Sequence, residues 1–114
     1  MVFKLTAEQM LENLNTFNSY IEKYITGERK DKLKKFYESI QQTLIDSPAS
    51  TKESHHNCFP GGYLDHVNRV IEMALVLDRV WDKFNQKKNY TLEELVFSCL
   101  NHDLGKLDQF ERVR

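Results

Sequence analysis

The end of the last expected helix combines a histidine, a carboxylate and an apolar stripe. Asp103 lies three residues after Leu100 and four after Cys99, so its side chain falls on the helix face of these apolar residues. Its neighbour His102 lies at the edge of the same stripe. Because an isolated carboxylate is costly to bury, Asp103 requires a cation, strong hydrogen bonds or a metal ion.

A second histidine, His66, lies four residues before Val70, at the border of the apolar face of the preceding expected helix. If these two helices pack together, His66 approaches His102 and Asp103. Two imidazoles and one carboxylate suit a divalent metal ion, and we expect Mn, Fe, Co, Ni, Zn or Mg. Spacing alone leaves an alternative, in which His102 and Asp103 form a helix C-cap pair and His66 is hydrogen-bonded in the interior.

Two apolar stripes predict a helical hairpin in residues 1–47. The first helix begins at a capping box formed by Thr6 and Gln9 and ends near Gly27. The second stripe spans residues 33–44, and Pro48 ends its helix. The aromatic side chains of both stripes are expected in the core, namely Phe17, Tyr24, Phe36 and Tyr37.

Two further helices are expected in the second half of the chain. The third begins near residue 62 or 63, and the fourth begins at a second capping box formed by Thr91 and Glu94. Gly105 is placed to end the fourth helix. The apolar stripe of the third helix comprises Val67, Val70, Ile71, Ala74, Leu77 and Trp81.

Composition predicts a single all-α domain over residues 1–114. It divides into the hairpin, a motif-bearing loop over residues 48–62 and core helices over residues 63–106. With 40% apolar and 29% charged residues, disorder is excluded as the main state. The net charge of −1 argues against a general nucleic-acid binder.

Location and surface charge are also constrained. No apolar run of ~18 residues exists, so no membrane span is expected. The chain shows no secretory signal pattern, which predicts a cytoplasmic protein with Cys58 and Cys99 as reduced thiols. The basic run over residues 28–35 is typical of a solvated helix face, and the alternative is a patch that binds a phosphate-bearing partner. The oligomeric state stays open.

Two separate motifs resemble those of one enzyme family. Residues 101–106, Asn-His-Asp-Leu-Gly-Lys, resemble the HD-x-G-K signature of the HD superfamily of metal-dependent phosphohydrolases. Residues 55–66 resemble the H-H-x(3)-P-G-G-x-L-x-H stretch of HD domains found beside exonucleases and in conjugative relaxase proteins. The resemblance covers residues 48–106 and implies an HD-domain-like helical bundle, with four main helices and the start of a further segment.

The resemblance also implies roles for individual residues. His66, His102 and Asp103 would be metal ligands, and Asp103 would take part in catalysis. In the family, a bound metal activates a water that attacks a phosphorus atom. Lys106 would hold a phosphate oxygen of the substrate or pair with a carboxylate; the alternative is an exposed lysine that favours the helix C-terminal dipole.

The upstream motif adds residues that would contact substrate. His56 would be a catalytic proton donor and His55 a substrate contact, or one of them a ligand for a second metal. The alternative is a solvent-exposed histidine pair. Gly61 and Gly62 would let the backbone approach a phosphate at the helix N-terminus.

Departures from the family pattern leave other functions open. The family's metal site is usually closed by an aspartate on a later helix, and Asp108 lies too close to the HD pair for that role. The leading expectation is a phosphohydrolase acting on a nucleotide or nucleic-acid phosphate ester. The alternative is a truncated or inert HD-like module that binds a nucleotide or a partner protein. A third possibility is a structural zinc site of His56, Cys58, Cys99 and His102.

Overall fold

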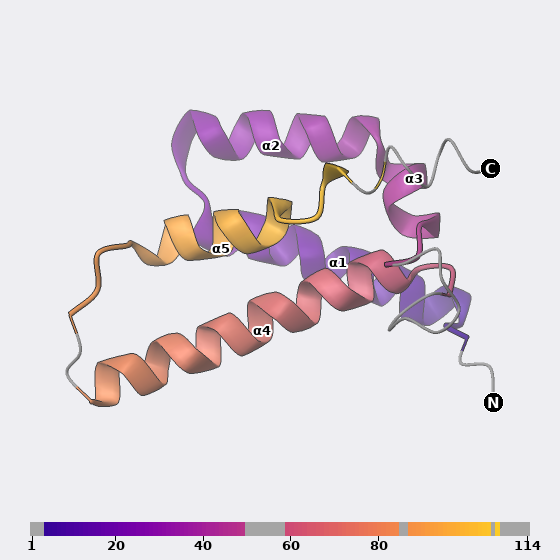
Figure 1. Cartoon of the computed structure of the whole chain (residues 1–114). Coiled ribbons are helices and arrows are strands. Elements are labelled where there is room, and N and C mark those ends of the chain that lie inside the picture. The colour runs from indigo at the N-terminus through magenta and orange to yellow at the C-terminus, as the bar shows by residue number, and fades with distance from the viewer. Residues whose placement is uncertain (1–3, 50–58, 85–86, 106, 108–114) are drawn as a thin grey trace.

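The computed structural model describes residues 4–49, 59–84, 87–105 and 107, and these residues form five helices (Figure 1). The helices are α1 (Ala7–Tyr24), α2 (Gly27–Ser39), α3 (Gln41–Asp46), α4 (Gly62–Lys83) and α5 (Leu92–Asn101). No strand occurs in the described ranges. The predicted all-α class is therefore confirmed.

The helices pack around a core to which α1 and α4 contribute most. In Figure 1, α2 lies on one side of α5 and α4 on the other, while α3 leads from α2 back toward the start of α4. α4 packs against α1, α3 and α5. The buried apolar core comprises Leu14, Phe17, Ile21, Ile25, Tyr37, Leu44, Tyr63, Leu64, Val67, Ile71, Val96, Leu100 and Leu107.

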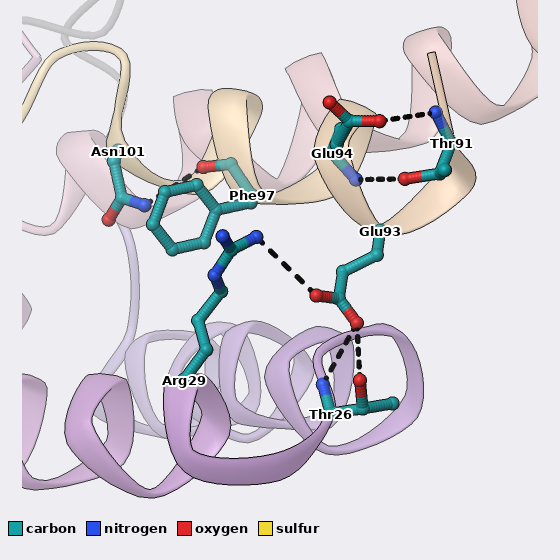
Figure 2. A network of polar contacts seen from close by, with 7 residues as sticks. All are labelled: Thr26, Arg29, Thr91, Glu93, Glu94, Phe97 and Asn101. Carbon is teal, nitrogen blue, oxygen red and sulfur yellow. Dashed lines mark hydrogen bonds and ion pairs between the residues drawn. The ribbon is translucent and has the colours of Figure 1, made fainter.

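Both predicted capping boxes are confirmed. The Thr6 hydroxyl accepts from Gln9 N at 3.1 Å, and the Gln9 side chain accepts from Thr6 N at 2.8 Å. Thr91 and Glu94 form the same pair of bonds at the start of α5 (Figure 2). The start of α4 at Gly62 also agrees with the prediction.

Three predicted helix boundaries in the chain are wrong. The second stripe is divided at Ile40, whose backbone leaves the helical region, and Ser39 Oγ donates to the Phe36 carbonyl at 2.6 Å in the preceding turn. α1 ends at Tyr24, whereas Gly27 has a φ of 64° and begins α2. α5 ends at Asn101, four residues before Gly105.

The second half of α4 departs most from the prediction. Leu77 and Trp81 were expected in the core but are 62% and 48% exposed. The ten residues of α5 span about 15 Å, whereas the 22 residues of α4 span about 33 Å. Figure 1 accordingly shows the C-terminal end of α4 diverging from α5. Phe36, likewise expected in the core, is 42% exposed.

Side-chain contacts connect the start of α2 to α5. Glu93 accepts hydrogen bonds from Thr26 N at 3.1 Å and Thr26 Oγ1 at 2.6 Å, and pairs with Arg29 at 3.4 Å (Figure 2). The Arg29 guanidinium lies 4.8 Å from the centre of the Phe97 ring. Other basic side chains of this run pair with acidic ones, including Lys34 with Glu22 at 3.1 Å. These pairings favour the solvated-face interpretation of the run.

Within the described part of the chain, no helix has the length and apolar character that crossing a membrane requires.

Candidate metal centre

The start of α4 is held in place by the backbone at the C-terminal end of α3. Gly61, the N-cap residue of α4, has a φ of 83°, a conformation that favours glycine. Its N–H donates to the Asp46 carbonyl at 3.2 Å, and Tyr63 N donates to the Ser47 carbonyl at 2.9 Å. These bonds determine where the first turns of α4, including His66, lie relative to the core.

The end of α5 meets this part of α4. Of the residues predicted as metal ligands, His102 is the C-cap of α5 and Asp103 follows in a turn. The structure brings both together with His66. The Asp103 Oδ2 atom lies 3.0 Å from His102 Nε2 and 3.5 Å from His66 Nε2, and the two imidazole centres are 5.6 Å apart.

The geometry of this cluster fits a metal ion. One potential ligand atom from each of the three residues lies within 4.8 Å of the other two. Two atoms bound tetrahedrally to one ion at ~2.1 Å lie roughly 3.4 Å apart. Both Asp103–histidine separations are close to that value, and the two imidazoles, whose centres lie 5.6 Å apart, would have to move toward each other to complete a three-ligand site.

The cluster is accessible to solvent on one side. The side chain of Asp103 is 20% exposed, and those of His66 and His102 are 30% and 33% exposed. The carboxylate is therefore mostly covered, as its position on the apolar stripe predicts, without being sealed in the core. An ion bound here would keep open positions for water or for a substrate oxygen.

The orientation of His102 is set by the backbone. Its Nδ1 lies 2.7 Å from the Cys99 carbonyl, and a carbonyl only accepts, so Nδ1 is the protonated nitrogen. In a neutral ring, Nε2 then presents a lone pair to Asp103 Oδ2. Two acceptors 3.0 Å apart repel unless a proton or a metal cation lies between them. The predicted capping role and the predicted ligand role of His102 are thus compatible.

The hydroxyl of buried Tyr37 forms hydrogen bonds at the C-terminal end of α5, directly before the cluster residues His102 and Asp103. Tyr37 Oη lies 2.6 Å from Asn101 Oδ1 and 3.2 Å from the Leu100 carbonyl, and Asn101 Nδ2 donates to the Phe97 carbonyl at 2.9 Å. Burial raises the pKa of Tyr37, so its hydroxyl stays protonated. The predicted burial of Tyr37 is confirmed, whereas the hydrogen bonds of its hydroxyl were not predicted. The signal was a tyrosine where a phenylalanine would fill an apolar stripe.

The remaining predicted site residues divide into two groups. His55, His56, Cys58 and Lys106 lie outside the described residues, so their roles stay predictions. Gly61 and Gly62 are buried, and their N–H groups donate to the carbonyls of Asp46 and Phe59 at 3.2 and 2.9 Å. Their predicted contact with phosphate gains no support from this arrangement, because both amides already have protein acceptors.

Cys99 bears on the predicted structural zinc site. Its thiol is free and partly buried, and burial raises its pKa, which disfavours the thiolate that zinc requires. Among the described residues, Cys99 is also not a member of the cluster formed by His66, His102 and Asp103. The structural zinc site therefore remains a prediction, because two of its four ligands, His56 and Cys58, lie outside the described residues.

A concave region lies between α2 and α5. Its volume is about 440 Å³, and its lining residues are Glu28, Arg29, Lys32, Leu33, Phe36 and Phe97. The Arg29 side chain is already engaged by Glu93 and by the Phe97 ring. This hollow shares no residue with the His–Asp cluster, so it does not contribute to the candidate centre.

Comparison of the chain with known protein families, characterised proteins and solved structures found no match. The resemblance to the HD superfamily therefore depends on the two motifs alone.

Proposed function

We propose that this protein is a metal-dependent phosphohydrolase that acts on a nucleotide or nucleic-acid phosphate ester. His66, His102 and Asp103 would hold a divalent ion. The main support is that the Nε2 atoms of two histidines from different helices converge on one carboxylate oxygen, at 3.0 and 3.5 Å.

A divalent cation accounts for this convergence with a single group, whereas protons require two. Without a cation, one proton must lie between His102 Nε2 and Asp103, and a second proton must lie on His66 Nε2 for His66 to donate to the same oxygen. A metal ion accepts electron pairs from both imidazoles and from the carboxylate at once. The bond from His102 Nδ1 to the Cys99 carbonyl would keep Nε2 aimed at the ion, as outer hydrogen bonds do in many metal sites.

In hydrolysis, different residues of the chain would hold the ion, donate a proton and contact the phosphate. A bound ion would lower the pKa of a coordinated water and neutralise phosphate charge. Asp103, mostly covered but reachable from solvent, would hold the ion at the protein surface, where a bulky nucleotide can approach. His56 as proton donor, and Lys106 and His55 as phosphate contacts, follow from the motif resemblance.

Metal binding and turnover should be measured together. We would strip the purified protein with a chelator, titrate it with Mn²⁺ and Zn²⁺ and assay an aryl phosphodiester and nucleotides. His102→Ala and Asp103→Ala should weaken metal binding at least about tenfold and abolish turnover. Asp78→Ala is the matched control, because Asp78 is a largely covered carboxylate on α4 outside the cluster. Unchanged metal binding and turnover in both cluster variants would contradict the proposal.

A non-catalytic HD-like module is the second candidate. It is favoured by the ligand count, since the cluster among the described residues supplies three protein ligands and leaves a solvent-facing side. Nucleotide binding by the metal-loaded protein with no turnover of any phosphate ester would support this function over hydrolysis.

A further inference from the structure

Tyr63 places a hydroxyl group in the core without a partner. Its side chain is 0% exposed, and its Oη has no hydrogen-bond partner. The other such atom in the described part of the chain is Asn68 Oδ1, whose amide group still donates to the Asn13 carbonyl at 2.9 Å. A buried hydroxyl that makes no bond is unfavourable, and phenylalanine would fill the same space without this penalty. The hydroxyl therefore requires an explanation.

Tyr63 lies beside the candidate metal centre. It precedes His66 by three residues in the first turns of α4, so the two side chains lie on neighbouring parts of one helix face. The bond from Tyr63 N to the Ser47 carbonyl holds the start of this helix. Burial raises the pKa of Tyr63 most, and electrostatic interactions with Tyr37 and Asp103 raise it further. The hydroxyl is therefore a neutral donor, and Asp103 is the carboxylate among the groups that act on it.

Of these two neighbours, Asp103 is the better acceptor. The Tyr37 hydroxyl directs its proton at the Asn101 side chain and the Leu100 carbonyl, so toward Tyr63 it offers only a neutral oxygen. A carboxylate offers about four lone-pair sites, so it can accept a further hydrogen bond beside its existing contacts. A negatively charged acceptor also forms a stronger bond than a neutral one.

We propose that Tyr63 is a positioning residue of the metal centre, whose hydroxyl donates to Asp103 when that carboxylate ligates a divalent ion. One carboxylate oxygen would face the ion and the other would accept from Tyr63 Oη. The bond would fix the rotation of the carboxylate, which is how outer hydrogen bonds tune metal affinity. This inference rests on the proposed function.

Two isosteric variants separate this role from a structural one. Tyr63→Phe and Tyr37→Phe each remove one buried tyrosine hydroxyl, the first without a partner and the second with two. In the metal-free protein, Tyr63→Phe should leave the urea midpoint of unfolding unchanged or raise it. Tyr37→Phe should lower that midpoint, because it removes a hydroxyl that is already hydrogen-bonded.

Metal binding supplies the decisive measurement. Mn²⁺ and Zn²⁺ titrations should give an about tenfold weaker affinity for Tyr63→Phe than for the wild type. The visible absorption of the Co²⁺-substituted protein should change as well, because the ligand field depends on carboxylate orientation. A purely structural tyrosine would move neither readout in a stably folded variant.

The outcomes distinguish the two proposals. If the wild-type protein binds no divalent ion, the proposed function fails and this inference fails with it. If the wild type binds and Tyr63→Phe binds equally tightly, only the role of Tyr63 is overturned. If Tyr63→Phe destabilises the metal-free protein as much as Tyr37→Phe does, the hydroxyl already has a partner and the inference is also overturned.

Discussion

The second half of α4, residues 73–83, contains more apolar residues than the first half, residues 62–72, and yet is the more exposed of the two. In the first half, Tyr63, Val67 and Ile71 are fully buried. In the second half, Met73 and Leu77 are 66% and 62% exposed. The candidate metal centre adjoins the first half, where the end of α5 reaches His66.

The difference shows how coverage by neighbouring elements creates a site. α3 and the C-terminal end of α5 both meet the first half of α4, which is why an acid and two imidazoles are brought together there. Toward the C-terminal end of α4, α5 diverges (Figure 1). The cluster sits at the edge of the covered region, which explains its partial burial and its access to solvent.

Truncating one apolar side chain in each half should test the contrast most strongly. Ile71→Ala opens a cavity in the core and should lower the free energy of unfolding by about 3 kcal/mol. Leu77→Ala should change it by less than about 0.5 kcal/mol, because the side chain is already solvated. Urea denaturation measures both. Equal losses would mean that the second half of α4 is packed in solution.

Stabilisation of the protein by a metal ion should depend on the first half of α4 alone. At a free concentration of 100 times its Kd, an ion that binds only the folded protein adds about 2.7 kcal/mol, which raises the Tm. His66→Ala should lose most of this rise, whereas Met73→Ala, on the exposed part of the same helix, should retain it. Differential scanning calorimetry with and without Zn²⁺ measures the shift. A full rise in the His66 variant would exclude that residue as a ligand.

The start of α4 depends on a glycine conformation. Gly61→Ala should lower the free energy of unfolding by about 1–2 kcal/mol, because alanine disfavours the positive φ. The added Cβ would also lie 3.0 Å from Met10 Cγ. Gly27→Ala is the control, with a positive φ and nothing within 4 Å of the new atom. A larger loss of unfolding free energy for Gly61→Ala than for Gly27→Ala would reflect the contact between the new Cβ and Met10. Equal losses would show that the Met10 side chain moves aside.

The smallest expected effect concerns the exposed half. Asp78 pairs with Lys88 at 2.8 Å and accepts from Tyr90 Oη at 3.1 Å, which connects this half of α4 to residues that precede α5. The hydrogen bond from Lys88 lowers the pKa of Asp78. The associated stability is present above the ordinary pKa of an aspartate and is lost as pH falls through the lowered value.

Asp78→Asn should therefore reduce the acid sensitivity of unfolding slightly, as measured by urea midpoints between pH 2 and pH 7. A variant with the same acid sensitivity as the wild type would show that this ion pair does not contribute to stability.

Features decided by neighbouring residues were predictable from the sequence. The capping boxes at Thr6 and Thr91 depend on side chains three residues away, and the start of α4 follows a glycine that adopts a positive φ. Helical spacing also predicted that Asp103 is largely covered, although Asp103 lies in the turn after α5 and not within the helix. The interruption at Ile40 was not predictable, because the apolar spacing of the second stripe continues across it.

Periodicity identifies which residues share a helix face, and it indicated the chemical types of the site: two imidazoles and a carboxylate on adjacent helices. It does not reveal which parts of a face other elements will cover, since that depends on where each helix ends and on the angles at which helices cross. The exposed Leu77, the partners of the Tyr37 hydroxyl and the unpartnered hydroxyl of Tyr63 were therefore settled by packing between distant segments. Burial and hydrogen bonding across such segments are properties of the assembled fold, and no local pattern encodes them.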